Sequence, residues 1–287
     1  MIFSSFKYQM SKLASAAVTV MLVAAGCQRP QIETMPQLHC QGKATIYEAV
    51  AALDEQRRGL VPLQATAQCR MEWRDAEGRV RRERFDAQVR FMPPHQLFFR
   101  GHRFGEIRFG TNEDEFWLRI KPELDTYWYG TRELAQECSH VLMMNPVNLT
   151  EALGLVEIDA QWELFHRDGW DLLTQRDNGR PVKRVYVDGC DYRVRRIEYY
   201  DRFGEISAAT DLADYTTVAD GVAIPTSIRL ATIYRGLEES SAQINLQNIR
   251  QFEPTPTQAR NLFERPGRDG YGTLLKLDQR CNFVEVD

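Results

Sequence analysis

Cys27 is the residue whose surroundings most clearly suggest a covalent modification. A basic stretch with Lys7 and Lys12 precedes an apolar run over residues 13–25, and small residues at 24–26 lead directly to Cys27. The run is shorter than the roughly 20 apolar residues that cross a bilayer, so it is typical of a signal peptide that is removed. Small side chains let a peptidase approach the backbone, and a thiol beside the cut site can carry a diacylglyceryl group.

The four residues that end this stretch, Ala-Ala-Gly-Cys at 24–27, resemble the lipobox of bacterial lipoproteins. The resemblance implies a lipoprotein signal peptide over residues 1–26, lipidation of Cys27 and anchorage of the exported chain to a membrane. The alternative is an ordinary secretory signal in which Cys27 plays no part. In such lipoproteins an Asp after the cysteine is similar to an inner-membrane retention signal. Because Gln28 stands there instead, we expect the outer membrane, with the chain facing the periplasm.

The rest of the sequence carries none of the short motifs that mark common active sites. It contains no HExxH, Gly-x-Ser-x-Gly, Walker or dinucleotide-binding motif. No two cysteines have the spacing of a zinc knuckle. The histidines are scattered through predicted loops and strand ends, at His39, His95, His102, His140 and His166. We therefore predict a noncatalytic protein without a metal or cofactor; a hydrolase whose residues assemble from distant positions is the open alternative.

The amino-acid composition excludes some classes of binding partner. The chain has 36 Lys and Arg against 40 Asp and Glu, a formal net charge of −4. A nucleic-acid binder would show a basic excess, and the basic run at residues 79–84 alternates with Glu83 as a solvated strand does. No second apolar stretch is long enough to cross a membrane. The expected partners are therefore a membrane, reached through the lipid anchor, and another envelope protein.

Cysteine usage leaves the pairing open. Five cysteines follow Cys27, namely Cys40, Cys69, Cys138, Cys190 and Cys281. Because the number is odd, one stays free or pairs between molecules, or all are reduced, and two bridges among five can be drawn in about 15 ways. Cys69 lies on the apolar face of a predicted strand, and we expect it to be a buried thiol.

The first elements of the mature chain follow from local patterns. Residues 27–43 combine the modified cysteine with a polar, proline-containing stretch, which predicts a flexible linker. Apolar residues at helical spacing between Thr45 and Arg58 predict a helix that Thr45 caps and Gly59 ends. From Leu63 the period changes to two, as a strand with one buried face requires.

Turn signals divide the remaining chain into many short strands. A long hairpin covers residues 63–91, and further strands are predicted at 96–100, 106–110, 115–120, 126–129, 162–165, 170–174, 182–188, 192–200, 205–215, 222–234 and 240–249. Helices are predicted at 131–138 and 145–155, the second with Asn145 as cap and Pro146 at its first position. A short helix at 257–263 and a strand at 274–277 end the chain. We predict a mainly β, α+β fold in which one antiparallel sheet curls over its apolar face.

Several segments in the second half of the chain resemble those of a known family. Its pieces are Arg195 to Asp201, then Gly204, then Asp214-Tyr215, Asp220 to Pro225 and Ala242 to Leu246. Together with a first helix leading into a long hairpin, they resemble the LolA/LolB-like lipoprotein carriers and their outer-membrane lipoprotein-sorting relatives. The resemblance implies a half-barrel domain over residues 44–253, with helices as a lid on its concave side, followed by a C-terminal extension over 254–287.

In that family an apolar cavity between sheet and lid takes acyl chains. The inward-facing residues that would line such a cavity here are Ala65, Ala67, Cys69, Met71, Val89, Ile224 and Ile228. An anchored chain cannot shuttle across the periplasm, so we predict noncatalytic binding of a lipid acyl chain or lipoprotein at the membrane. A docking lipoprotein whose interior is filled by its own helices is the alternative. The aromatic residues Trp117, Tyr127, Trp128 and Tyr129 could line the mouth or be half-buried sheet.

Overall fold

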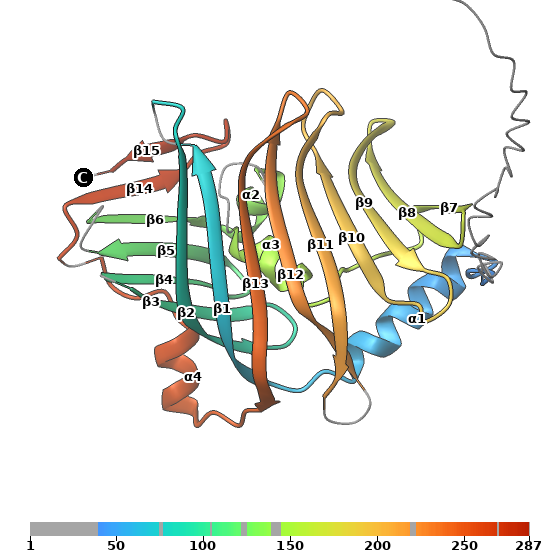
Figure 1. Ribbon diagram of the computed structural model, residues 1–287, viewed down its shortest axis with the longest axis horizontal. Coiled ribbons are helices and arrows are strands. Elements are labelled where there is room, and N and C mark those ends of the chain that lie inside the picture. Colours follow the sequence, from blue (N-terminus) through green and yellow to red (C-terminus); the bar gives the residue numbers. More distant parts are fainter. Residues whose placement is uncertain are drawn as a thin grey trace, which may run out of the picture. The chain divides into compact units, whose positions relative to one another are not determined.

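A computed structural model describes residues 40–74, 77–103, 105–121, 125–138, 145–218, 222–268 and 270–286. The predicted signal peptide, Cys27 and most of the linker lie outside these residues. The described part is mainly β with a few helices, and its strands form one open, curved, mainly antiparallel sheet, so the predicted fold class is confirmed (Figure 1). Within these ranges, no helix is long and apolar enough to cross a membrane.

The first helix forms where the sequence predicts it. Helix α1 spans Ile46–Arg58, and the Thr45 hydroxyl caps it by accepting the backbone N–H of Glu48. Its apolar stripe buries Ala49 and Leu53. The Gln56 amide donates to the backbone carbonyl of Tyr192, which fastens the helix to the segment before β10.

The strands run in two antiparallel meanders. The first contains β1 (Leu63–Arg74), β2 (Val80–Met92), β3 (Gln96–Arg103), β4 (Gly105–Thr111), β5 (Glu115–Lys121) and β6 (Thr126–Thr131). The second contains β7 (Glu163–Arg167), β8 (Trp170–Asp177), β9 (Arg180–Asp188), β10 (Val194–Tyr200), β11 (Ile206–Thr217), β12 (Ala223–Tyr234) and β13 (Leu237–Gln251). The predicted alternation holds, for example with Ala67 opposite Ala87 in the first hairpin.

The two meanders are joined by strands from opposite ends of the domain. β1 pairs with β13 in antiparallel register, with Ala67 opposite Leu246, so the sheet order runs β6 to β1 and then β13 to β7 (Figure 1). The C-terminal segment adds β14 (Thr273–Leu277), parallel to β6, and β15 (Phe283–Glu285) at the edge. The predicted C-terminal extension therefore contributes strands to the same sheet.

Three short helices complete the described part. Helices α2 (Arg132–Glu137) and α3 (Pro146–Glu151) lie between β6 and β7, and α4 (Pro256–Phe263) precedes β14. Asn145 caps α3 and Pro146 occupies its first position, as predicted. The helix ends at Glu151 rather than near Leu155, because the chain turns through Gly154, whose φ of 84° is accessible mainly to glycine.

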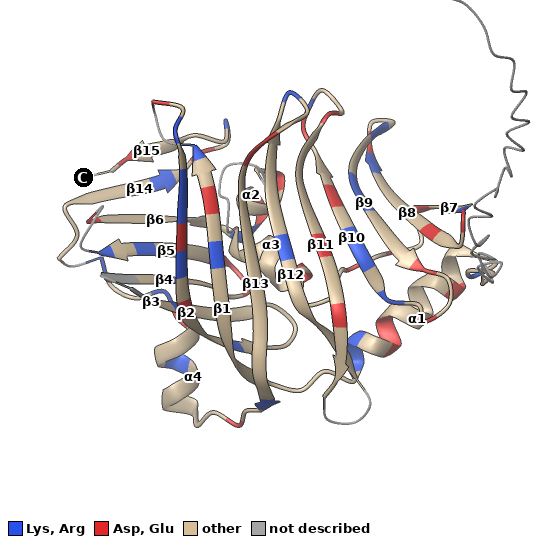
Figure 2. Ribbon diagram, in the orientation of Figure 1, with Lys and Arg blue, Asp and Glu red and all other residues tan. Residues whose placement is uncertain are grey.

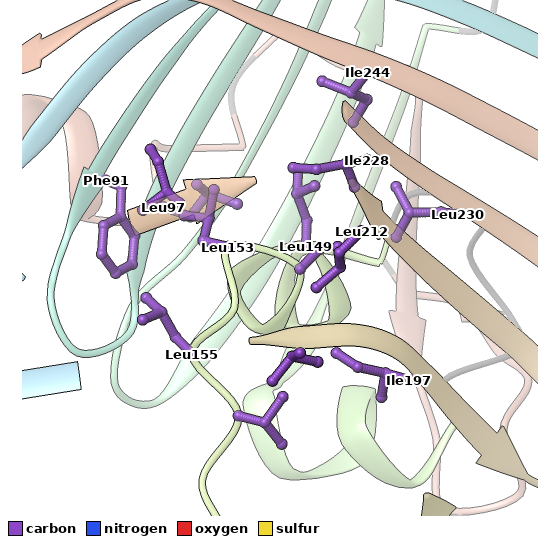
Figure 3. Close-up of a cluster of buried hydrophobic side chains, with 14 of the residues drawn as sticks. Phe91, Leu97, Leu149, Leu153, Leu155, Ile197, Leu212, Ile228, Leu230 and Ile244 are labelled. Atoms are coloured by element: carbon purple, nitrogen blue, oxygen red, sulfur yellow. The ribbon is translucent and has the colours of Figure 1, made fainter. Parts of the chain in front are cut away.

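One apolar cluster fills the concave side of the sheet. It joins inward residues of β1–β4 and β8–β13 to α1 and to the chain after α3. Figure 3 shows Leu149, Leu153 and Leu155 lying among side chains such as Ile228 and Leu212. A smaller cluster gathers Phe116, Ala135, Cys138, Val147 and Leu277 beside the C-terminal strands.

Charged residues recur along the strands of the second meander (Figure 2), where they alternate with inward-facing residues and so lie on the opposite face. Arg196 donates to Glu198 at 2.9 Å and pairs with Asp211 on the next strand. Arg229 lies 3.5 Å from Asp211 and also pairs with Glu238. Since each charge has a partner on its own or a neighbouring strand, this face is polar without a concentration of one sign.

Two disulfides fix distant segments. Cys40 is bonded to Cys190, and Cys138 is bonded to Cys281. Cys69 is a free thiol that is 4% exposed, which confirms the expectation of a buried cysteine on the first strand. Burial, with a smaller contribution from Asp86, raises the pKa of Cys69 to about 12.

Candidate functional site

The predicted ligand-binding residues come together on the concave face. Five of them are buried, namely Ala67, Cys69, Val89, Ile224 and Ile228, and the partly buried Ala65 and Met71 pack against the same cluster. Side chains of the protein itself, including Leu149, Leu153 and Leu155, pack in the same apolar cluster (Figure 3). The prediction of one shared apolar surface therefore agrees with the structure, and its use by a ligand stays a prediction.

Residues 145–162, which we name the cover segment, are the part of the chain between α2 and β7 that closes this interior. All of α3 is buried. The Asn145 amide donates to the backbone carbonyl of Ala135 at 2.7 Å, and the Thr150 hydroxyl donates to that of Pro146 at 3.0 Å. The helix α3 is thus buried, and the polar side chains of Asn145 and Thr150 are hydrogen-bonded to α2 or within the segment itself.

Glu151 ties the cover segment to the sheet. The Lys183 ammonium on β9 lies 2.6 Å from one Glu151 oxygen, and the Tyr199 hydroxyl on β10 donates to the other at 2.7 Å. The side chains of Glu151 and Lys183 are 9% and 14% exposed. Burial and the neighbouring Glu151 carboxylate raise the pKa of Tyr199, which keeps its hydroxyl a donor. If the cover segment moved away, the buried charges of Glu151 and Lys183 would each lose their partner, which is costly. These contacts therefore hold the cover segment in one position.

A cleft of about 910 Å³ opens beside the cover segment. Its size lies in the range of small-molecule sites, roughly 300–1,000 Å³. The walls come from α1, the turn after β2, α2, the cover segment and β8–β10 with the turn after β10. None of the ligand-binding residues predicted from the sequence lines it; its apolar wall is Leu155, Ile158, Trp162 and Val182, three of which also belong to the core.

Basic side chains from separate elements gather around Glu157 at one end of this cleft. An Arg57 nitrogen and the His95 Nε2 atom lie 3.4 and 3.3 Å from the same Glu157 oxygen. Arg132, from α2, lines the cleft nearby, and its buried Nε finds no hydrogen-bond partner in the described residues. Burial and the positive charge of Arg132 lower the pKa of His95, despite Glu157 and Glu113. The arrangement is suited to holding an anionic group, and a carboxylate of the chain already lies there.

Trp117, Tyr127 and Tyr129, three of the aromatic residues considered for a cavity mouth, belong instead to the covered opposite face of the first meander. The fourth, Trp128, is on the concave face, paired with Leu118. Trp117 is 1% exposed and Tyr127 is fully buried. The Tyr127 hydroxyl donates to the backbone carbonyl of Pro266 at 2.9 Å, and the Arg265 guanidinium lies 4.7 Å from the centre of the Tyr129 ring. The segment after α4 therefore covers these aromatic residues, as the alternative of a buried sheet face predicts.

The described residues show no group of three or more His, Cys, Asp or Glu side chains arranged to hold a metal ion. Outside the cleft, the Nδ1 atom of the half-exposed His166 lies 2.7 Å from Oδ1 of the buried Asp171. Asp171 also accepts the backbone N–H of Lys43, next to the Cys40–Cys190 bridge. This pair therefore fastens the start of the domain to β8.

No family model and no curated protein matches the chain. Among solved structures it is similar to a LolA superfamily protein from Nitrosomonas europaea, at 12% identity and a TM-score of 0.49, covering 75% of this chain and 97% of that one. It is also similar to an outer membrane lipoprotein-sorting protein domain from Vibrio parahaemolyticus, at 14% identity and a TM-score of 0.48, covering 76% of this chain and 97% of that one. A DUF1329 family protein from Desulfovibrio piger is similar at 13% identity and a TM-score of 0.46, covering 75% of this chain and 95% of that one.

Two of these three structures carry names of the LolA-like and lipoprotein-sorting proteins that the sequence resembles.

The residues of the cleft were missed in the sequence because they are far apart along the chain. Arg57, His95, Arg132 and Glu157 belong to separate elements, and each on its own has the pattern of an ordinary surface residue. Glu151 offered one local signal, since it follows the apolar residues of a short predicted helix and would be buried with them. A charge on a buried helix requires a partner, and this requirement could have directed attention to Lys183.

Proposed function

We propose that this chain is a lipid-anchored protein of the bacterial cell envelope that binds an acyl chain of a lipid or lipoprotein, without catalysis, between its sheet and the cover segment. The observation that carries the proposal is that the apolar concave face is closed by a segment that pairs with no strand. Leu149, Leu153 and Leu155 pack on the sheet through side chains alone, so an acyl chain can take over their apolar contacts. The polar contacts that opening must break include those of Glu151 with Lys183 and Tyr199.

The two disulfides support a location in the bacterial periplasm. Bridges such as Cys40–Cys190 and Cys138–Cys281 persist in oxidising compartments, including the bacterial periplasm. This fits export by the predicted signal peptide and anchorage through Cys27. We place the protein on the periplasmic side of the outer membrane, because Gln28 follows the cysteine.

The anchor is tested by replacing the thiol. Metabolic labelling with a radioactive fatty acid should mark the parent chain and not Cys27→Ser, which should accumulate as a soluble or uncleaved product. Label that persists in Cys27→Ser, or never enters the parent, would exclude lipidation at this residue.

Acyl binding is tested on the mature chain with Cys27→Ser, exported through a cleavable secretory signal. Native mass spectrometry should detect copurified lipid, and a fluorescent fatty acid should bind with a defined stoichiometry. Since the strands pair with one another, the delipidated protein should keep a β-rich circular dichroism spectrum. Absence of both copurified lipid and fatty-acid binding would leave the docking alternative.

One observation favours that alternative, an envelope lipoprotein that only docks another protein. The interior is filled by the protein's own side chains, and every residue of α3 is buried. In a docking protein the cover segment would stay closed under all conditions. Hydrogen exchange of the amides in residues 145–156 separates the two: faster exchange after addition of a fatty acid supports acyl binding, and unchanged exchange supports docking.

A further inference from the structure

The cluster around Glu157 has the composition of an anion site that is filled from within. Arg57 extends from α1, His95 from the turn between β2 and β3, and Arg132 from the start of α2. Several carboxylates lie nearby: Glu133 and Glu137 of α2 also line the cleft, Asp54 pairs with Arg57 at 2.9 Å, and Glu113 lies 3.9 Å from His95. Among the described residues, Glu157 is the carboxylate that contacts both Arg57 and His95.

Glu157 is held loosely compared with Glu151. Its side chain is 55% exposed, and its distances to Arg57 and His95 are 3.4 and 3.3 Å. Glu151, in contrast, is buried and contacts Lys183 at 2.6 Å. A partly exposed ion pair contributes little stability, so another anion can displace Glu157 at small cost. The unpartnered Arg132 Nε offers such an anion a hydrogen bond that Glu157 does not use.

We propose that Arg57, His95 and Arg132 bind the anionic headgroup, phosphate or carboxylate, of the amphiphile whose acyl chain enters beneath the cover segment, and that Glu157 occupies this site until the ligand arrives. The proposal rests on the proposed function for the acyl chain. To that function it adds the chemical class of the headgroup and the residues that bind it.

The position of the site favours an amphiphile over a free anion. Leu155 and Ile158, on either side of Glu157 in the cover segment, line the same cleft and belong to the apolar core. A headgroup at the basic cluster therefore lies next to the boundary of the interior that the chain must enter. Because Glu157 is part of the cover segment, its displacement also removes contacts that hold this segment to α1 and to the turn after β2, so headgroup binding and opening are linked.

The test compares ligands that differ only in the headgroup. Decyl phosphate, decanol and inorganic phosphate are titrated into the mature chain with Cys27→Ser, and binding is followed by calorimetry. The second readout is the pKa of His95 from the NMR signal of its ring, which a bound anion raises and decanol does not. The variants are Arg132→Gln, Glu157→Gln and, as control, Arg202→Gln, an exposed arginine that lines the cleft away from Glu157.

Decyl phosphate should bind at least tenfold more tightly than decanol, as a charge-assisted contact allows. Arg132→Gln should abolish this preference, Glu157→Gln should strengthen phosphate binding several-fold, and Arg202→Gln should change neither. Equal affinity for decyl phosphate and decanol, or a preference unchanged in Arg132→Gln, overturns the headgroup site while leaving acyl binding intact. Phosphate binding that depends on Arg132, without binding of either amphiphile, supports the anion site and overturns the acyl function. Absence of all binding overturns both.

Discussion

Cys138, at the C-terminal end of α2, is bonded to Cys281, in the turn between β14 and β15. The bridge closes a loop of 143 residues. It links the C-terminal strands to the helices that precede the cover segment, and both half-cystines contact the small apolar cluster around Phe116 and Leu277. The edge of the sheet at β14 and β15 thus has a covalent attachment in addition to its pairing with β6.

Removal of this bridge should destabilise the protein substantially. In Cys138→Ala/Cys281→Ala the unfolded chain regains the entropy that a long closed loop restricts, so the free energy of unfolding should fall by about 2–5 kcal/mol. Urea unfolding followed by circular dichroism measures this. An unchanged midpoint in the double variant would mean that the bridge does not form in solution, and mass spectrometry of non-reduced peptides checks that directly.

The buried thiol of Cys69 should be inert in the folded protein. With a pKa near 12, it is almost fully protonated at pH 8, and its 4% exposure also blocks access of a reagent. Iodoacetamide should leave the peptide containing Cys69 unmodified in native buffer and modify it completely in urea. Rapid modification of the native chain would show that β1 opens far more often than its position between β2 and β13 implies.

Glu198 should contribute to the acid sensitivity of the fold. Burial raises its pKa, but hydrogen bonds from Arg196, Tyr200 and Tyr186 outweigh burial and lower it below the ordinary value of 4.5. A lowered carboxyl pKa contributes stability that is fully present above the unfolded-state value and is lost as pH falls through the folded-state value. The free energy of unfolding should therefore decline from about pH 4.5 downward.

The variant Glu198→Gln should unfold about 1–3 kcal/mol more easily at pH 7 and show a weaker decline in acid. Glu163→Gln is the matched control, because Glu163 also pairs with an arginine but is 59% exposed. Its effect should stay within about 1 kcal/mol. Equal effects of the two variants at pH 7 would contradict the assignment of Glu198 to a buried network.

Ala67→Trp tests how tightly the concave side is filled. Ala67 is 2% exposed and lies opposite Ala87 and Leu246, so an indole must displace side chains of the core. The ligand-free protein should lose about 1–3 kcal/mol, and fluorescent fatty-acid binding should also fall. Gln68→Trp, one residue away on the exposed face, is the control and should change neither. An unchanged melting temperature with reduced binding would instead indicate empty space beneath Ala67.

Local patterns predicted much of the fold because they act within one element. Thr45 and Asn145 were identified as helix caps, and the alternation from Leu63 onward defined the buried face of β1. The pairing of β1 with β13 has no such local signal, since alternation defines a face and not a neighbour. Disulfide partners were undetermined for the same reason.

Part of the candidate site could likewise be predicted from local patterns, and part could not. Alternation placed Ala67 and Ile228 on one apolar face, and both lie in the core. The basic cluster depends on how α1, α2 and the cover segment pack together, which no spacing along the chain specifies. Arg57 and Arg132 become neighbours of Glu157 only through tertiary structure.

The pairing of β1 with β13 also has a consequence for the time course of folding. Thr66 and Gln247, which share a hydrogen bond across this pair, are 181 residues apart. Contacts between such distant residues form slowly, because a long loop must close before they add stability. During synthesis, one edge of β1 stays unpaired until β13 has been made, and an unpaired strand edge is prone to associate with other chains. The unfinished chain is therefore most exposed to aggregation in this interval.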